Sequence, residues 1–173
     1  MQKVMLGVVG VLFLLSAADT KPTRATFVTN NDIQTTLKKM AKSGVTDEQM
    51  RMVDVGKSNV GVAVVYRSPK TTQNAVEHDQ VTEVYYIIEG SGTLMTGGAL
   101  LNPERAAPDS ASVKGLTGPS VRGSSLRSAE SRRVAPGDVV IIPPGVGHWF
   151  SAVDGTLKYL VVRLDTDKVL PPK

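Results

Sequence analysis

The chain has 173 residues, of which 41% are hydrophobic and 21% are charged, and its formal net charge is +4 at pH 7. It contains no cysteine, which excludes disulfide bonds, a thiolate metal site and a lipid attached through a thioether. The most basic stretch has no aromatic residues to stack on bases, so we interpret it as a solvated surface and expect no nucleic-acid partner; its arginines are Arg122, Arg127, Arg132 and Arg133.

The N-terminus has the features of a secretory signal. Lys3 precedes an apolar run over residues 4–15, and small residues follow at positions 16–18. The run is shorter than the roughly 20 residues that cross a bilayer, and it has the length of the apolar region of a signal peptide. We therefore predict that residues 1–18 are a signal peptide, and that the mature protein is secreted or periplasmic and not held in a membrane. The alternative is an uncleaved anchor.

Residues 19–46 are predicted to form a polar linker followed by one helix. Asn30 or Asn31 is a suitable N-cap, and Gly44 is a stop signal. Between them, apolar residues at helical spacing fall on one face: Ile33, Leu37, Met40 and Ala41. We expect this face to pack against the outside of a domain that spans residues 47–173.

After residue 47 the pattern changes to short runs typical of β-strands, separated by glycine and proline. The predicted strands are Met50–Val55, Val60–Tyr66, Glu83–Glu89, Thr93–Thr96, Arg132–Val134, Val139–Ile142 and Lys158–Leu164. Many short strands with such turns predict an all-β fold, either a sandwich or a barrel.

The chain has only two histidines, and each lies in a stretch that has the pattern of a metal site. His78 precedes Glu83 in a stretch that ends at Gly90. His148 follows a turn that contains Gly137, Pro143 and Gly145. Two imidazoles and one carboxylate are the ligand set of an open mononuclear centre, which leaves coordination positions free for substrate.

Both stretches resemble the two motifs of the cupin superfamily, over roughly residues 58–164. The second motif lacks only its final asparagine, which is replaced by Ala152. In the first motif, Val76 occupies the position of the first histidine, and the opening glycine is absent. A rival register makes His78 the first histidine and Gln80 the second, but it leaves the gap to Glu83 one residue short. The resemblance implies a small, single-domain, type-2-like cupin with a double-sheet jelly-roll barrel.

Strand parity extends the predicted site into a cavity. Alternate side chains of a strand face the same way, so an inward Glu83 places Tyr85 and Ile87 inward, and an inward His148 does the same for Phe150. The predicted cavity combines the metal ligands His78, Glu83 and His148 with a wall of Val76, Tyr85, Ile87 and Phe150.

The missing first histidine leaves either an open centre of two histidines and one carboxylate or a site degraded below useful affinity. Gln73, Gln80 or a water could fill the vacant position. The expected cofactor is one divalent transition metal, either Fe, Mn, Ni, Zn or Cu, because imidazole and carboxylate suit several of these. The alternative is that His78 and His148 only hold turns in place through hydrogen bonds.

Residues 97–129 are predicted to form a long loop between the motifs, with a short strand around Val121–Leu126. Loops of this length are commonly lids or mobile segments. In many cupins this connection lies near the barrel mouth, so Arg122, Ser124 and Arg127 either contact an anionic substrate or face water.

The resemblance leaves two classes of function open. One is a secreted metalloenzyme, an oxidoreductase, lyase or isomerase, that acts on an oxygenated small molecule or a carbohydrate-like substrate. The other is a non-catalytic cupin that binds or senses a small molecule and has a vestigial metal site. The outward faces of Tyr86 and Trp149 would form an exposed apolar patch, which predicts a homodimer.

Overall fold

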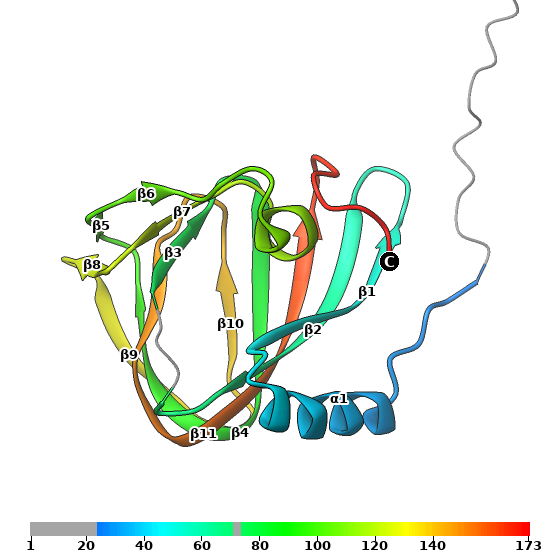
Figure 1. Cartoon of the computed structure of the whole chain (residues 1–173), viewed down its shortest axis with the longest axis horizontal. Coiled ribbons are helices and arrows are strands. Elements are labelled where there is room, and N and C mark those ends of the chain that lie inside the picture. Colours follow the sequence, from blue (N-terminus) through cyan, green and yellow to red (C-terminus); the bar gives the residue numbers. More distant parts are fainter. Residues whose placement is uncertain (1–23, 71–73) are drawn as a thin grey trace, which may run out of the picture.

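The computed structural model describes residues 24–70 and 74–173, which form an α-helix, a short π-helix and eleven strands (Figure 1). The predicted signal peptide lies outside the described residues. The elements are α1 (Asn30–Ser43), β1 (Asp47–Asp54), β2 (Asn59–Arg67), β3 (Ala75–His78), β4 (Val81–Thr96), β5 (Ala99–Leu101), β6 (Glu104–Arg105), η1 (Val113–Thr117), β7 (Ser120–Gly123), β8 (Ser125–Arg127), β9 (Glu130–Val134), β10 (Val139–Ile142) and β11 (His148–Asp165).

Helix α1 begins one or two residues earlier than predicted, because its N-cap is Thr29 and both Asn30 and Asn31 are already helical. The Thr29 hydroxyl accepts from the backbone N–H of Asp32 at 3.2 Å, and the Asp32 carboxylate accepts from the backbone N–H of Thr29 at 3.0 Å. This reciprocal capping box satisfies two backbone donors at once, an advantage that a single asparagine cap does not have. The stop predicted at Gly44 is confirmed, since this residue adopts the left-handed conformation with φ 75°.

The apolar face of α1 packs on the outside of the β-structure, beside β2 (Figure 1). Leu37 and Met40 are buried in a cluster with Met50 and Val64. Ala41, which we expected on this face, is exposed. Within the described part of the chain, no helix is both long and apolar enough to cross a membrane.

Two long antiparallel strands, β4 and β11, contribute to both walls of the fold. Residues 81–89 of β4 pair with the C-terminal half of β11 on one side and with β10 on the other. The same half of β11 also pairs with β2. Residues 92–96 pair with the N-terminal half of β11 and with β9. Strand β1 extends the sheet beyond β2, and β3 pairs with β7 and with the start of β11. The two walls enclose an interior (Figure 1), so the predicted all-β jelly-roll fold is confirmed.

Glycine bends β4 at a point where the sequence predicts a break. Residues 83–89 and 93–96, predicted as two strands, belong to one continuous strand. Gly90 has φ 81°, and a Cβ atom built there would lie 1.8 Å from the backbone oxygen of Thr156. The paired strand has an irregular register around Gly155, which has φ 69°. Glycine at this position therefore allows both strands to bend together while their pairing continues.

The side-chain alternation predicted for β4 is confirmed. Glu83, Tyr85 and Ile87 are 2%, 3% and 0% exposed, whereas Tyr86 is 47% exposed. The inward apolar side chains form a central cluster of Ala63, Val65, Tyr85, Ile87, Leu94, Val134, Ile142, Phe150, Leu157, Tyr159 and Val161.

The segment 97–129, predicted as a long loop with one short strand around Val121–Leu126, contains four short strands and η1. Strand β5 pairs with β8, β6 pairs with β7, and β7 pairs with β3 (Figure 1). These strands are two to four residues long, too short to show a clear period of two in the sequence. Through β7, the segment lies against the strand that ends at His78.

Candidate metal centre

The three predicted metal ligands come from the ends of three strands. His78 ends β3, Glu83 lies near the start of β4, and His148 begins β11. The turn before His148 is attached to β3, because the backbone N–H of Gly145 donates to the His78 carbonyl at 2.8 Å. In the register of β3 and β11, His148 lies opposite Val76. The turn of the second motif therefore holds the two histidines near each other.

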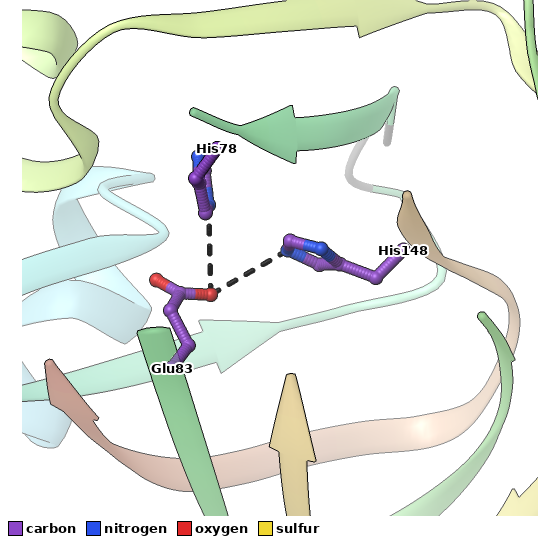
Figure 2. A group of neighbouring side chains, drawn as sticks. All are labelled: His78, Glu83 and His148. Atoms are coloured by element: carbon purple, nitrogen blue, oxygen red, sulfur yellow. Dashed lines mark ion pairs between the residues drawn. The ribbon is translucent and has the colours of Figure 1, made fainter. Parts of the chain in front are cut away.

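The structure brings His78, Glu83 and His148 together (Figure 2). Nε2 of His78 lies 3.6 Å from Oε2 of Glu83, and Nε2 of His148 lies 3.5 Å from the same oxygen. All three residues are buried, and one candidate ligand atom from each lies within 4.8 Å of the other two. These three residues, called the metal group below, could hold a metal ion.

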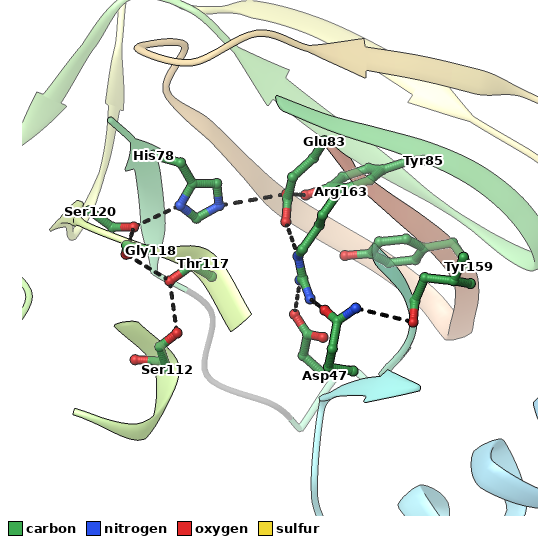
Figure 3. Close-up of polar contacts among 12 residues, drawn as sticks. Asp47, His78, Glu83, Tyr85, Ser112, Thr117, Gly118, Ser120, Tyr159 and Arg163 are labelled. Atoms are coloured by element: carbon green, nitrogen blue, oxygen red, sulfur yellow. Dashed lines mark hydrogen bonds and ion pairs between the residues drawn. The ribbon is translucent and has the colours of Figure 1, made fainter. Parts of the chain in front are cut away.

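Hydrogen bonds behind the two rings determine which nitrogen carries the proton. The Ser120 hydroxyl donates its single proton to the Gly118 carbonyl at 2.9 Å, so it must accept from Nδ1 of His78 at 2.8 Å (Figure 3). Nδ1 of His148 lies 3.1 Å from the Val146 carbonyl oxygen, which can only accept. In its neutral form, each ring therefore carries its proton on Nδ1 and directs the lone pair of Nε2 toward Glu83.

Three electron-pair donors thus converge on one small volume, namely the two Nε2 atoms and Oε2 of Glu83. Burial lowers the pKa of His78, so its imidazole is neutral at pH 7. Lone pairs directed at each other across about 3.5 Å repel one another, and a cation among them removes that repulsion. A neutral imidazole whose Nδ1–H is bonded elsewhere is the usual form of a histidine ligand, so the donor set fits a divalent metal.

Glu83 is anchored through its other oxygen by Arg163. Nε of Arg163 donates to Oε1 of Glu83 at 2.9 Å, and one terminal nitrogen donates to Asp47 (Figure 3). The other terminal nitrogen donates to Gln49. Burial alone would raise the pKa of Glu83, but the Arg163 guanidinium holds that pKa well below its usual range. Glu83 therefore stays ionised with Oε1 engaged, which leaves Oε2 available to a cation.

Tyr85 contacts the carboxylate oxygen that faces the histidines. Its hydroxyl donates to Oε2 of Glu83 at 2.8 Å. Burial raises the pKa of the Tyr85 phenol well above its ordinary value, so the group is a neutral donor at pH 7. Its ring lies 4.7 Å from the ring of Tyr159, measured between centroids. Tyr85 therefore orients the carboxylate in addition to forming part of the cavity wall.

The metal group lines a cavity of about 260 Å³. Val76 and Tyr85 lie in its wall. Ile87 and Phe150, which we expected there, belong instead to the central apolar cluster. The other residues that line the cavity are Thr46, Asp47, Val65, Arg67, Asn74, Ser112, Leu116, Thr117, Arg122, Tyr159, Val161 and Arg163.

The structure does not bring Gln80 to the metal group. The Gln80 side chain donates to Asp167 at 3.1 Å, and Gln73 lies outside the described residues. Of the three side chains expected at the barrel mouth, Arg122 lines the cavity. Ser124 is exposed and bonded to Asn102, and Arg127 is also exposed.

Sequence reasoning missed four residues that support the site: Asp47, Gln49, Ser120 and Arg163. Arg163 carried a usable signal, because it follows Tyr159 and Val161 at a period of two on the inward face of an apolar strand. An arginine at such a position needs a buried partner. The other three carried no signal, since polar residues near strand ends and in loops are common on protein surfaces.

Replacing Ser120 by alanine should weaken metal binding about 10- to 100-fold, because Nδ1–H of His78 loses the acceptor that orients the ring. A competition titration against a chromophoric chelator measures this affinity. Ser124→Ala, which removes an exposed hydroxyl bonded to Asn102, is the matched control and should bind as the unaltered protein does. Equal affinities in all three proteins would show that the ring does not depend on Ser120.

Comparison with known families identifies the fold family. Residues 51–169 match the family described as cupin, and this range is more than half of the chain. The chain belongs to the cupin family. The matched range contains both motifs and all three residues of the metal group.

Several solved structures are similar to this cupin at low sequence identity. A Bacillus halodurans protein is 14% identical, with 84% of this chain and 86% of that chain covered and a TM-score of 0.49. The DMSP lyase DddQ from Ruegeria pomeroyi is 19% identical, with coverages of 77% and 53% and a TM-score of 0.44. An RmlC-like cupin from Methanocaldococcus jannaschii is 14% identical, with coverages of 70% and 82% and a TM-score of 0.42. A comparison with curated protein sequences finds no match.

Proposed function

We propose that this cupin binds one divalent transition metal through Nε2 of His78, Nε2 of His148 and Oε2 of Glu83, and that it is an enzyme acting on a small oxygenated molecule. The observation that carries the proposal is the convergence of three lone pairs, each oriented by a hydrogen bond behind it. Imidazole and carboxylate suit Fe, Mn, Ni, Zn and Cu, so the ligand set indicates a divalent transition metal and does not select one of these five.

Three protein ligands leave coordination positions open, where a bound metal would supply Lewis-acid or redox chemistry. The reactions that suit such a centre are those of an oxidoreductase, a lyase or an isomerase. The protein's own groups have separate roles. Arg163 and Tyr85 hold the Glu83 carboxylate, while apolar side chains such as Leu116 and Val161 exclude water from one side of the cavity.

Metal content tests the proposal directly. Protein prepared without an affinity tag, loaded with excess Zn(II) or Mn(II) and then desalted, should retain about one metal per chain by elemental analysis. A stoichiometry far below one would contradict the proposal. Full loading without turnover of any acid, alcohol or sugar in a broad panel would instead favour the alternative, a cupin that binds or senses a small molecule.

Replacing Val76 by histidine should complete a four-ligand centre. Val76 lies two residues before His78 on the same face of β3, lines the cavity, and is opposite His148 in the register. A third imidazole, as the fourth ligand, should tighten metal retention and lower activity, because it occupies a position open to substrate. The signature is a changed Cu(II) paramagnetic resonance spectrum that shows an additional nitrogen ligand.

The matched control for this change is Glu77→His, which places an imidazole on the opposite face of the same strand. It should leave the Cu(II) spectrum unaltered. If Val76→His also leaves the spectrum unaltered, Val76 does not face the metal, and the register assigned to the first motif is wrong.

We also propose that the cupin forms a homodimer through the outer face of β4 and β10. Tyr86, Val139 and Ile141 are 47%, 61% and 66% exposed, and Tyr86 lies opposite Val139 in the register. Exposed apolar patches commonly mark interfaces. Light scattering at micromolar concentration should give twice the chain mass, and Ile141→Lys should give a monomer. A monomeric unaltered protein would contradict the proposal.

Trp149, which we expected in this patch, is half-buried.

The proposed cellular location rests on the N-terminal segment alone. We propose that residues 1–18 are removed on export, and that this small, type-2-like cupin acts in the periplasm or outside the cell. The basic and apolar regions of the segment and the small residues at 16–18 support this interpretation.

A further inference from the structure

The cavity beside the metal group has more positive than negative charge in its wall. Its two carboxylates, Asp47 and Glu83, both pair with Arg163. Two further arginines, Arg67 and Arg122, line the cavity, and neither forms an ion pair with a carboxylate among the residues that the structure describes. Among the arginines and carboxylates of the wall, three arginines face two carboxylates. The excess is therefore one positive charge, to which a divalent metal would add two.

Arg67 is held in a fixed orientation on the cavity wall. Its Nε donates to the Tyr159 hydroxyl at 2.8 Å. Its guanidinium carbon lies 5.6 Å from the ring centre of Phe150 and 5.7 Å from that of Tyr159, within the range of cation–π contacts. Burial raises the pKa of Tyr159 to about 12, so this partner is neutral at pH 7 and brings no negative charge to Arg67.

Arg122 lies where the metal-site cavity meets a second cavity of about 320 Å³. Both cavities share Asn74, Ser112 and Arg122 in their walls. The guanidinium of Arg122 donates to the Ser112 hydroxyl at 2.8 Å and is exposed. A ligand that passes from the second cavity to the metal group would therefore meet a cation at the boundary.

We infer that the ligand of this site is a small organic carboxylate, bound with its carboxylate on the guanidinium of Arg67. The planar guanidinium presents parallel N–H groups that match a carboxylate. Val65, Leu116 and Val161 supply apolar wall for the organic part. The volume of about 260 Å³ is below the range of about 300–1,000 Å³ for pockets that hold drug-sized ligands, which favours a small acid. A contact between the opposite end of the acid and a metal depends on the proposed function. The contact between its carboxylate and Arg67 does not depend on it.

Ligand-observed NMR can test this inference with propionate and its uncharged amide, propionamide. Binding is measured on EDTA-treated protein and on Zn(II)-loaded protein. Propionate should bind both forms, and propionamide should bind at least about tenfold more weakly. Arg67→Gln should weaken propionate binding about tenfold or more, because hydrogen bonds to a charged group are lost. Arg122→Gln should have a smaller effect, since this side chain is exposed.

The matched control is Arg127→Gln, because Arg127 is an exposed arginine outside the walls of both cavities; it should bind propionate as the unaltered protein does. Equal binding of propionate and propionamide would overturn the inference, as would tighter binding of inorganic phosphate than of propionate. Equal propionate binding by a folded Arg67→Gln protein would also overturn it. If that variant does not fold, the comparison of acid with amide on the unaltered protein decides.

The two proposals can fail separately. The EDTA-treated protein tests the Arg67 contact without metal, and elemental analysis tests the metal centre without propionate. Arg67-dependent binding by a protein that retains no metal would support the carboxylate site and contradict the metal centre. Full metal content with no preference for the acid would do the reverse.

Discussion

Replacing Arg163 by methionine should lower the free energy of unfolding by about 3 to 5 kcal/mol, because it leaves the buried carboxylate of Glu83 and the partly buried carboxylate of Asp47 without their partner. Arg163 is 1% exposed and joins Glu83, Gln49 and Asp47, which come from two other strands. Methionine fills much of the same volume but compensates neither charge. Urea unfolding of EDTA-treated protein, followed by circular dichroism, measures the loss without any contribution from metal binding.

Two controls separate the charge of Arg163 from its shape. Arg163→Lys keeps the charge but cannot donate to three acceptors at once, so its stability should be intermediate. Adding Glu83→Gln to Arg163→Met should recover part of the loss, because a neutral amide costs less to bury than a carboxylate. If Arg163→Met costs less than about 1 kcal/mol, the network is hydrated and contributes as a surface ion pair does.

The sequence was sufficient to indicate that His78, Glu83 and His148 form one candidate group, because the information that relates them is local. The spacing of His78 from Glu83 and the turn before His148 each depend on one short stretch of chain. The alternation along β4 follows from the period of two alone, which is why Glu83 and Tyr85 face inward as expected. The period of two predicts which face of the strand a side chain lies on, but not whether it lines the cavity or the apolar cluster. Ile87 faces inward like Glu83, yet it lies farther along the strand, in the apolar cluster instead of the cavity wall.

The supporting residues could not be predicted because they depend on pairing between distant strands. Asp47 and Arg163 meet only because β1 and β11 flank β2, and Ser120 reaches His78 only because β7 pairs with β3. The role of Gly90 has the same origin. Whether a glycine ends a strand or bends it depends on the partner strand, here through the close approach of the Thr156 carbonyl.

Replacing His148 by alanine should abolish stable metal retention, with a loss of affinity greater than the roughly 10- to 100-fold that removal of an outer hydrogen-bond partner costs. The variant retains one imidazole and one carboxylate, and Oε1 of that carboxylate is engaged by Arg163. Elemental analysis after desalting should give about one metal per chain for the unaltered protein and close to none for the variant.

Gln80→Ala is the matched control for His148→Ala. Gln80 is the alternative ligand in the rival register, but its side chain donates to Asp167, so its removal should leave metal content unchanged. Loss of metal from Gln80→Ala with retention in His148→Ala would reverse the assignment of the first motif. Equal retention in both variants would mean that the metal binds elsewhere, and that the convergence of three lone pairs on Glu83 has a purely structural role.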